Sequence, residues 1–541
     1  MLSPSTTSLR SPVNRLIALL SFLARVSSSY FLIRIVPTVS ATFSIARCCT
    51  LAARENFREY YEELYPWQLS SLEQWLVPLS TYISPYIGIL LLCPVGDAKG
   101  FGTGEGHHSA ITKKVLGGLN IVWKPVQEHF SLLGDPASAV FGALHEIWSD
   151  ARSLRGLKSY DPDSPAQQRS WIAILSGNLK CPDSSGASSS HAPLLVASPD
   201  NKQVSDLTTE PLTAPERVSA ADRAIETVLA ARGSFVSTIL LPVILMFAVT
   251  AATFYDAYSK KGDKNTGLSL AYCVWYSWII VLGVASNSSI SIFSSEAAHR
   301  AFDGVIDLGK LESTSLRHRF INAHLWKSWS EATENAGWTA NATRHELRAD
   351  WRLWLRFCIG QLIGLSCVAF SSAGATVIAW TTPTTGLGCR SFNFILYVIL
   401  SAAASLLRVL YTWMSLDPHA KTNFRYRLPA LGFLYWLFVV VNSQVMILGT
   451  VFHLVGVFRT CWCDRLFWNE STQIELNSKT TEAVENADTY WLSTAYVVFG
   501  GVWLACFCCM VLRGFIVRKL QNFIDCKRAV AKEACRAVRQ S

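Results

Sequence analysis

Seven apolar runs, each about 20 residues long, constrain this 541-residue chain more than any other feature of its sequence. A helix of that length crosses about 30 Å of hydrocarbon, whereas a helix in a soluble core shows a polar face every third or fourth residue. None of the runs contains Asp, Glu or Lys. We therefore predict an all-α membrane protein with about seven transmembrane helices. The spans are 76–95, 235–255, 268–285, 357–380, 392–411, 431–457 and 491–512.

Composition and charge agree with this class. Half of the residues are hydrophobic and only 16% are charged, against about 25% in ordinary soluble domains. Much of the net charge of +9 lies in the first 54 residues and after Arg513, beside apolar segments. Basic residues in such places favour an anionic cytoplasmic leaflet. We expect the lipid bilayer as a partner and no nucleic acid.

The first 54 residues form an extension of different character. They carry six Arg and no Asp or Glu, and they are rich in Ser and Thr, which is the composition of a mitochondrial transit peptide. A signal peptide or anchor built on 16–23, an unstructured extension, and an eighth span over 13–37 stay open beside it.

Two long segments, 96–233 and 286–355, interrupt the spans. In the first, Asp135 and Pro136 predict a helix start, because Asp caps free amides and Pro suits the first turn; residues 181–216 have the composition of a disordered linker. The second is amphipathic and Trp-rich, which suits helices at the level of the lipid headgroups. The apolar stripe expected on the first helix is Val140, Phe141, Leu144, Ile147, Trp148 and Leu154.

Loop charges predict the orientation. The tail 513–541 contains eight Lys and Arg and belongs in the cytoplasm, with both long segments, which offer surfaces for cytoplasmic protein partners. The acidic loop of about 458–490 then lies outside. We expect a glycan on its triplet Asn469-Glu470-Ser471, and none at Asn287 or Asn341. The expected location is the plasma membrane or secretory pathway, with a mitochondrial membrane as the alternative.

The cysteines divide by position. Cys389, Cys461 and Cys463 fall in loops expected outside, where disulfides persist. A bridge from Cys389 to Cys461 or Cys463 is one expectation, and free thiols are the other. The cysteines near the cytoplasmic end of the last span and in the tail are candidates for palmitoylation. They are Cys506, Cys508, Cys509, Cys526 and Cys535.

Four stretches carry a resemblance to a known family: parts of 84–97, Gly134-Asp135-Pro136 with 145–148, 382–391, and Gly456-Val457 leading to 461–463. They resemble a family of uncharacterised multi-pass membrane proteins of filamentous fungi, over roughly residues 76–513. The resemblance implies the multi-pass topology and no activity.

Few residues point to chemistry. Without Asp, Glu or Lys in the spans, an ion-coupled transporter, a membrane aspartyl protease or a retinal protein is not expected. We expect no cofactor and no metal, because the spacing of His107, His108, His129 and His145 is irregular and His453 is the only histidine in a span. The polar group of the sixth span offers either hydrogen bonds between helices or a substrate or lipid pocket. Its candidate substrate-binding residues are Asn442, Gln444 and His453.

Three functional hypotheses follow. The first is a non-enzymatic protein with a receptor-like or scaffold role. The alternative is a transporter or channel for a neutral or lipidic substrate that uses Asn442, Gln444 and His453. A weaker alternative is a membrane-bound acyltransferase-like enzyme, because His145 and Asp150 have the spacing in which His serves as a base and Asp orients it. A structural role is favoured for both residues.

Overall fold

The computed structural model describes residues 72–94, 127–156, 165–181, 227, 239–289, 313–332, 338–383, 385–417, 424, 426–459 and 480–540. Within these ranges the chain is almost wholly helical, with one isolated antiparallel bridge between Leu179 and Ser313. The N-terminal extension 1–54 and the predicted eighth span lie outside the described residues.

Seven helical stretches are long and apolar enough to cross a membrane, so the predicted all-α membrane fold is confirmed. Prolines mark the first, in which Pro78 precedes a π-helical stretch. The first span comprises α4 (Leu72–Pro78), η2 (Leu79–Ile83) and α5 (Ser84–Leu92). The next five are α10 (Leu241–Ser259), α11 (Lys264–Ser288), α15 (Trp351–Thr381), α16 (Cys389–Ser415) and α18 (Arg427–Val455). The last joins α20 (Thr481–Asn486), η6 (Ala487–Leu492) and α21 (Ser493–Gln540).

Several helices extend past the apolar runs and so include charges at their ends. Asp256 lies in the last turn of α10 and Lys264 is the first residue of α11. The side chain of Asp263 accepts a hydrogen bond from the amide of Thr266 at 2.9 Å, which caps α11. Gly456, with a φ of 91°, ends α18 in the left-handed region that glycine adopts without steric cost.

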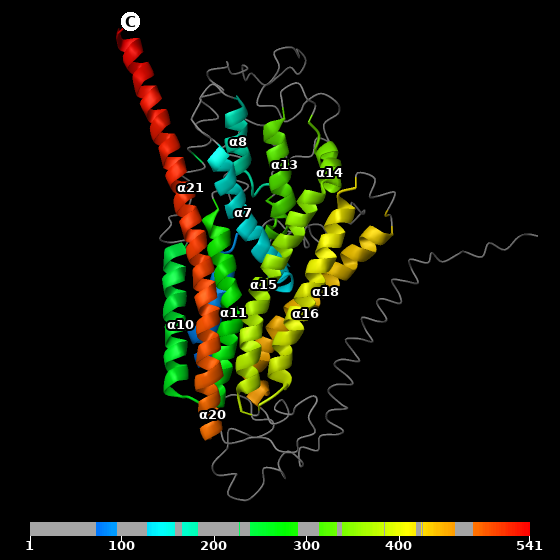
Figure 1. Ribbon diagram of the computed structural model, residues 1–541, viewed down its shortest axis with the longest axis vertical. Helices are drawn as coiled ribbons and strands as arrows, with labels where there is room; N and C mark the ends of the chain where they lie inside the picture. The colour runs from blue at the N-terminus through cyan, green and yellow to red at the C-terminus, as the bar shows by residue number, and fades with distance from the viewer. Residues whose placement is uncertain are drawn as a thin grey trace, which may run out of the picture.

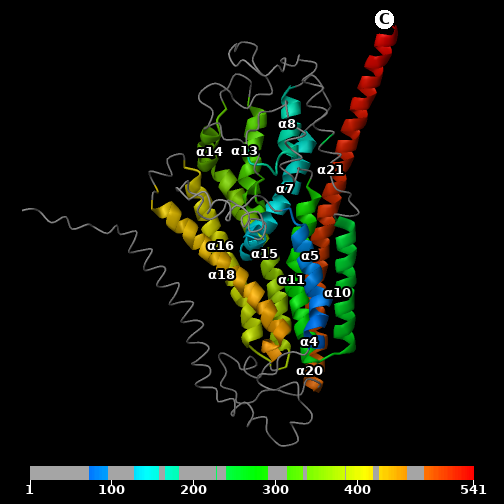
Figure 2. The same cartoon turned by 180° about the vertical axis from the view of Figure 1, so that it is seen from behind.

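α11 is the central helix of the bundle (Figures 1 and 2). It packs against α5, α10, α15 and α21, and nearly all of it is buried inside the protein. Trp275 and Trp278 are completely buried on it. The other spans are far less enclosed and show many large apolar side chains on their outer faces, as lipid contact requires.

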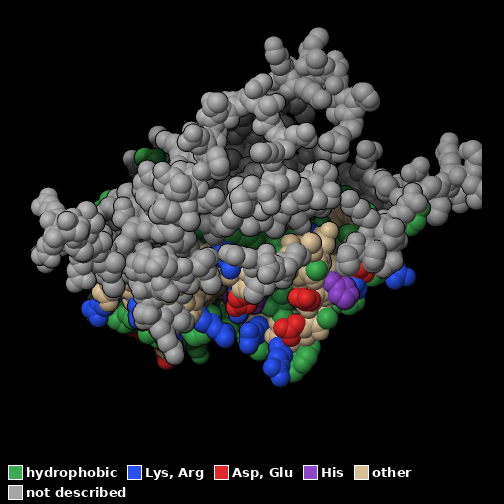
Figure 3. Space-filling view, turned by 90° about the horizontal axis from the view of Figure 1, so that it is seen from above, with side chains coloured by type: hydrophobic (Ala, Val, Ile, Leu, Met, Phe, Trp, Pro, Cys, Tyr) green, Lys and Arg blue, Asp and Glu red, His purple; other side chains and the backbone are tan. Residues whose placement is uncertain are grey.

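The two ends of the bundle differ (Figure 1). At the tail end, α21 continues beyond the other spans to the C-terminus, and α8 (Pro165–Leu175), α13 (Arg319–Glu331) and α14 (Ala340–Ala349) lie at the same end of the bundle. At the far end lie the turn 260–263, the loop 382–388 and the end of α18. Charged side chains of both signs appear on the described part of the tail-end face (Figure 3). The described parts of the two long segments thus share the end at which the tail emerges.

Two tryptophans of the Trp-rich segment pack inside the protein, whereas the sequence predicts helices at the level of the lipid headgroups. Trp326 and Trp329 of α13 are 1% and 4% exposed, and the indole of Trp326 donates to the carbonyl of Leu179 at 2.8 Å. They belong to the core formed with α8, together with Trp171. Trp351, at the start of α15, is 66% exposed and is the tryptophan that suits a headgroup position.

The largest departure from expectation concerns residues 127–142, which we call the inserted segment. The sequence places them in a cytoplasmic connection, but they pack among the spans. A short helix over 127–134 leads to α7 (Pro136–Gly156), and α7 packs on α11, α15, α16 and α21. α7 begins at Pro136, as the sequence predicts. Every residue from 137 to 143 is buried, whereas Trp148, predicted in the apolar stripe, is 57% exposed.

Candidate functional site: the inserted segment and a buried polar cluster

The inserted segment bends at Gly134, Asp135 and Pro136. Proline lacks an amide hydrogen, so a helix that passes through it leaves carbonyl groups without backbone partners. Side chains of the spans supply the missing hydrogen-bond donors. The hydroxyl of Tyr397 (α16) donates to the Leu133 carbonyl at 2.8 Å, and the amide of Asn442 (α18) donates to the Gly134 carbonyl at 2.9 Å. The bend is therefore satisfied by protein groups inside the bundle.

Gly134 makes the close approach to α18 possible. A Cβ atom at this position would lie 2.1 Å from the Val439 carbonyl oxygen and 2.6 Å from the Ser443 hydroxyl. On the α15 side, a Cβ at Gly364 would lie 2.1 Å from the carbonyl oxygen of Ala137. Glycines on both sides thus let the backbone of the inserted segment lie between α15 and α18.

Charged side chains gather where the inserted segment meets α16 and α18. We call Glu128, Asp135, Arg317, Arg408 and Tyr435 the inner polar cluster; each is at most 4% exposed. Arg317 lies 3.7 Å from Glu128 and donates to the Tyr435 hydroxyl at 2.7 Å, and that hydroxyl donates to Asp135 at 2.7 Å. The cluster lies about two helical turns from the tail-end termini of α16 and α18.

Each carboxylate of the cluster has further donors. The hydroxyl of Ser315 donates to Glu128 at 2.9 Å. The side chain of Asp135 accepts from the Ser138 amide at 3.3 Å, so Asp135 caps α7 at the positive end of its dipole. Both carboxylates are therefore well supplied with hydrogen-bond donors.

Arg408 of α16 is held differently. Its guanidinium donates to the Arg317 carbonyl at 3.2 Å and to Nδ1 of His318 at 2.8 Å, and it lies 5.7 Å from the centre of the Tyr435 ring. Within the described part of the chain, no carboxylate comes within ion-pair distance of it. Its Nε atom is buried and has no hydrogen-bond partner.

This geometry removes the reason for excluding chemistry with charged groups. In the described part of the chain, the buried residues of the spans include Arg408 but no carboxylate. Glu128, Asp135 and Arg317 come instead from chain between the spans. Ionisable groups enclosed in a membrane bundle are costly and usually functional, so the inner polar cluster is the candidate site.

A second group of contacts lies toward the far end. We call Tyr82, Tyr272, Tyr276 and His453 the far-end aromatic cluster. The hydroxyl of Tyr82 is hydrogen-bonded to Nε2 of His453, and the ring of Tyr272 stacks on the imidazole at 4.1 Å. Tyr272 donates to the Gly449 carbonyl at 2.9 Å, and Tyr276 is hydrogen-bonded to Thr450. These neutral contacts join the first span and α11 to α18.

The three predicted substrate-binding residues do not form one site. Asn442 is fully buried and bonds to the inserted segment and to Ser401 at 2.9 Å. His453 belongs to the far-end aromatic cluster, eleven residues and about 16 Å further along α18. Gln444 is exposed on the outer face of the helix. Only Asn442 therefore lies beside the inner polar cluster.

His145 and Asp150, the proposed acyltransferase-like pair, have different surroundings in the structure. The His145 ring lies among Phe141 and Phe320, at 5.8 and 4.6 Å, and stacks near His324 at 6.0 Å. Burial lowers the pKa of His145 to about 3, and repulsion from His324 when that ring is protonated contributes to the same direction. Asp150 lies near Arg319 instead. A histidine in these apolar surroundings is a poor base.

The remaining candidates are placed as follows. Cys389 is a free cysteine in the structure. Its expected partners Cys461 and Cys463, and the glycosylation candidate Asn469, lie outside the described residues, so the bridge and the glycan stay predictions. Cys508 is exposed, and Cys506 and Cys509 are buried. For Cys526 and Cys535 the structure describes the backbone alone.

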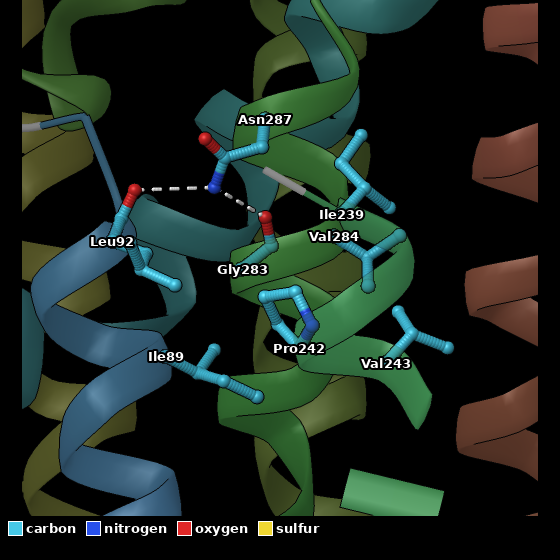
Figure 4. Close-up of a pocket in the computed structure, with 8 residues that line it drawn as sticks. All are labelled: Ile89, Leu92, Ile239, Pro242, Val243, Gly283, Val284 and Asn287. Atoms are coloured by element: carbon cyan, nitrogen blue, oxygen red, sulfur yellow. Dashed lines mark hydrogen bonds between the residues drawn. The ribbon is translucent and has the colours of Figure 1, made fainter. Parts of the chain in front are cut away.

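A small recess of about 10 Å³, open to the outside, lies between α5, α10 and α11 (Figure 4). Its walls are apolar, and Asn287 closes one side by donating to the carbonyls of Leu92 and Gly283 at 3.2 and 2.9 Å. It contains no residue of the inner polar cluster. The recess offers a solute little beyond apolar contact.

Sequence reasoning missed the cluster because Glu128, Asp135 and Arg317 lie in segments interpreted as cytoplasmic. One signal was present: Gly134-Asp135-Pro136 combines a residue without a side chain, a cap and a helix breaker, which is a pattern for a bent helix in a crowded place. Among the described residues, no group of three or more His, Cys, Asp or Glu could hold a metal ion. No protein-family model, no curated protein and no solved structure matches the chain significantly.

Proposed function

We propose that this protein is a transporter or channel for a small polar solute, with its pathway at the inserted segment. The observation that carries the proposal is the bent helix 127–142 between α15, α16 and α18. Its carbonyls at the bend accept hydrogen bonds from side chains of the spans. Non-regular backbone at membrane depth is tolerated where protein or a water-filled cavity covers it. Bent or broken helices with buried polar groups are characteristic of transporter binding sites.

The described structure then corresponds to a closed state. Asn442 and Tyr397 clamp the bend, and the Arg317 contacts connect the inserted segment to the chain that leads into α13. Opening requires these contacts to exchange for contacts with solute and water. The neutral or lipidic substrate expected from the span composition is replaced in this proposal by a polar one, because the buried groups beside Asn442 are charged.

The test is flux through the purified full chain in liposomes, with a panel of neutral, cationic and anionic solutes. Wild-type protein should pass at least one solute faster than protein-free liposomes. Asn442→Ala should abolish that flux, and Gln444→Ala, on the outer face of the same helix, should leave it unchanged. Flux equal to the empty-liposome background for every solute, or an Asn442→Ala variant as active as wild type and equally stable, would overturn the proposal.

The receptor-like or scaffold role is the second candidate, and one observation favours it. The tail-end unit of α8 and α13 is tied to the bundle through Arg317 and through the bond from Arg319 to Glu146 at 2.9 Å. Movement of the inserted segment would therefore reach a surface suited to protein partners. Capture of a tail-end partner that depends on Arg317, in a protein without flux, would favour this role.

A further inference from the structure

We propose that the inner polar cluster is an anion-binding site, in which Arg317 and Arg408 recognise the carboxylate or phosphate group of a small water-soluble solute. In the closed state the side chain of Asp135 occupies that site. This inference rests on the proposed transport function and names the substrate class.

The first support is that buried hydrogen-bond donors without a partner outnumber such acceptors in this part of the described chain. The Nε atoms of Arg317 and Arg408 are both buried without a partner. Among the described groups that bond the inserted segment, the one buried acceptor atom without a partner is Oδ1 of Asn442. A buried donor without a partner costs about 1–3 kcal/mol, more when charged. A ligand rich in acceptor oxygens would relieve this cost.

The second support is Arg408. It lies on α16, a rigid span, with 3% exposure, and within the described ranges its only polar contacts are a carbonyl and an imidazole. A guanidinium without an ion pair is expensive to bury. Its planar set of donors matches the two oxygens of a carboxylate or phosphate. A bound anion would therefore compensate for the free-energy cost of burying the Arg408 side chain.

The third support is the way Asp135 is held. Its carboxylate takes the Tyr435 hydroxyl and the Ser138 amide, at the N-terminus of α7. Hydroxyl, helix N-terminus and nearby guanidinium are the donors that bind anions in proteins. Asp135 thus shows where an external anion would sit.

A cation site is the opposing possibility, and the contacts argue against it. Glu128 accepts from Ser315 and lies 3.7 Å from Arg317, and Asp135 has its two donors. Both carboxylates already accept hydrogen bonds, and the guanidinium groups of Arg317 and Arg408 in the same cluster would repel an added cation.

The experiment measures anion binding to the purified full chain in nanodiscs of phosphatidylcholine alone. The probes are inorganic phosphate and acetate, with choline chloride as the cation arm, all at equal ionic strength. The readouts are thermal stability and calorimetric titration. Phosphate or acetate should raise the unfolding temperature of the wild-type protein. Choline chloride should raise it no further than chloride alone does.

Three variants sharpen the test. Arg408→Gln should weaken anion binding at least tenfold, whereas Arg356→Gln, an exposed arginine on α15, should leave it unchanged. Asp135→Asn keeps a helix cap but removes the competing charge, so it should bind phosphate or acetate several-fold more tightly than wild type. Tighter binding is not expected if Asp135 has a merely structural role. The Asp135→Asn variant therefore still tests the proposal if Arg408→Gln fails to fold.

The outcomes separate this inference from the transport proposal. Anion binding without flux keeps the anion site and removes transport. Flux of a neutral or cationic solute that Arg408→Gln leaves unchanged keeps transport and overturns the anion site. Equal binding in wild type, Arg408→Gln and Asp135→Asn also overturns it. An effect seen only when phosphatidic acid is added to the nanodiscs assigns the site to a lipid headgroup and overturns the water-soluble solute.

Discussion

The inner polar cluster and the far-end aromatic cluster both join α18 to its neighbours, but they take their polar groups from different parts of the chain. Tyr82, Tyr272 and His453 are aromatic and belong to spans. Glu128, Asp135 and Arg317 are charged and belong to chain between spans. Both clusters are buried, and each provides hydrogen bonds across helices.

The difference shows how this fold brings charge into an apolar bundle. A span must first be stable in lipid, which disfavours Asp, Glu and Lys along its length. A segment that packs only after the spans are in place meets a protein surface instead of lipid. Polar groups of the spans, such as Asn442 and Tyr397, then satisfy it. The following predictions test this contrast.

The largest effect is expected from Asp135→Ala. It removes the cap of α7 and leaves Arg317, Arg408 and Tyr435 without that carboxylate. Loss of one partner in a buried charged group costs about 3–5 kcal/mol. Thermal unfolding in nanodiscs measures it. The control Glu331→Ala, in an exposed pair with Lys327, should cost below about 0.5 kcal/mol; equal costs would show that the cluster is not buried as described.

Gly134→Ala should destabilise the protein by about 1–3 kcal/mol, because the added methyl meets backbone atoms of α18 that cannot move aside easily. Gly88→Ala, where nothing lies within 4 Å of the new Cβ, should be neutral or stabilising by up to about 1 kcal/mol. The unfolding temperatures of the two variants are compared directly. A harmless Gly134→Ala would place the inserted segment elsewhere.

Matched tyrosine variants compare the clusters. Tyr435→Phe loses bonds to Arg317 and Asp135, and hydrogen bonds to charged groups contribute about 1.5–3 kcal/mol. Tyr82→Phe loses a bond to His453, for which about 1 kcal/mol is expected. Denaturation of both variants in the same detergent gives the ranking. A larger cost for Tyr82→Phe would reverse the assignment of the charged cluster as the stronger constraint.

The smallest effect concerns pH. Burial and nearby positive charge lower the pKa of His145 to about 3 and that of His324 to about 4, against about 6.5 when unfolded. The unfolded chain therefore binds more protons below pH 6.5. The stabilisation is complete above that pH and is lost as the pH falls toward the folded values.

Between pH 7.5 and pH 5.5, His145 should account for about 1 kcal/mol of lost stability. His145→Phe keeps a flat ring beside Phe141 and Phe320 and should flatten the profile of unfolding temperature against pH. An identical profile in the variant would mean that the pKa of His145 does not differ between the folded and the unfolded protein.

The sequence predicts the spans well because a run such as 268–285 has one stable place, a membrane-spanning helix. It also predicts the start of α7, since Asp135 and Pro136 act locally. It does not predict where α7 packs, because the partners Tyr397, Asn442 and Tyr435 lie about 260 to 310 residues away. The helical period already places Asn442 and Gln444 on different faces of α18, but which face is buried depends on the neighbouring helices.

The insertion of residues 127–142 between the spans is tested most directly by a cross-link to α15. The hydroxyl of Ser138 on α7 donates to the side-chain oxygen of Gln361 on α15 at 3.1 Å, so thiols at these two positions lie within reach of a short reducible cross-linker. The variant Ser138→Cys/Gln361→Cys is made with the native cysteines replaced by alanine and a protease site inserted within 182–226. After cross-linking and cleavage, the two fragments should stay joined until reduced. The pair Ser138→Cys/Leu362→Cys, with Leu362 60% exposed on the outer face of α15, should separate. Separation of the Ser138→Cys/Gln361→Cys fragments in a folded protein would contradict the insertion.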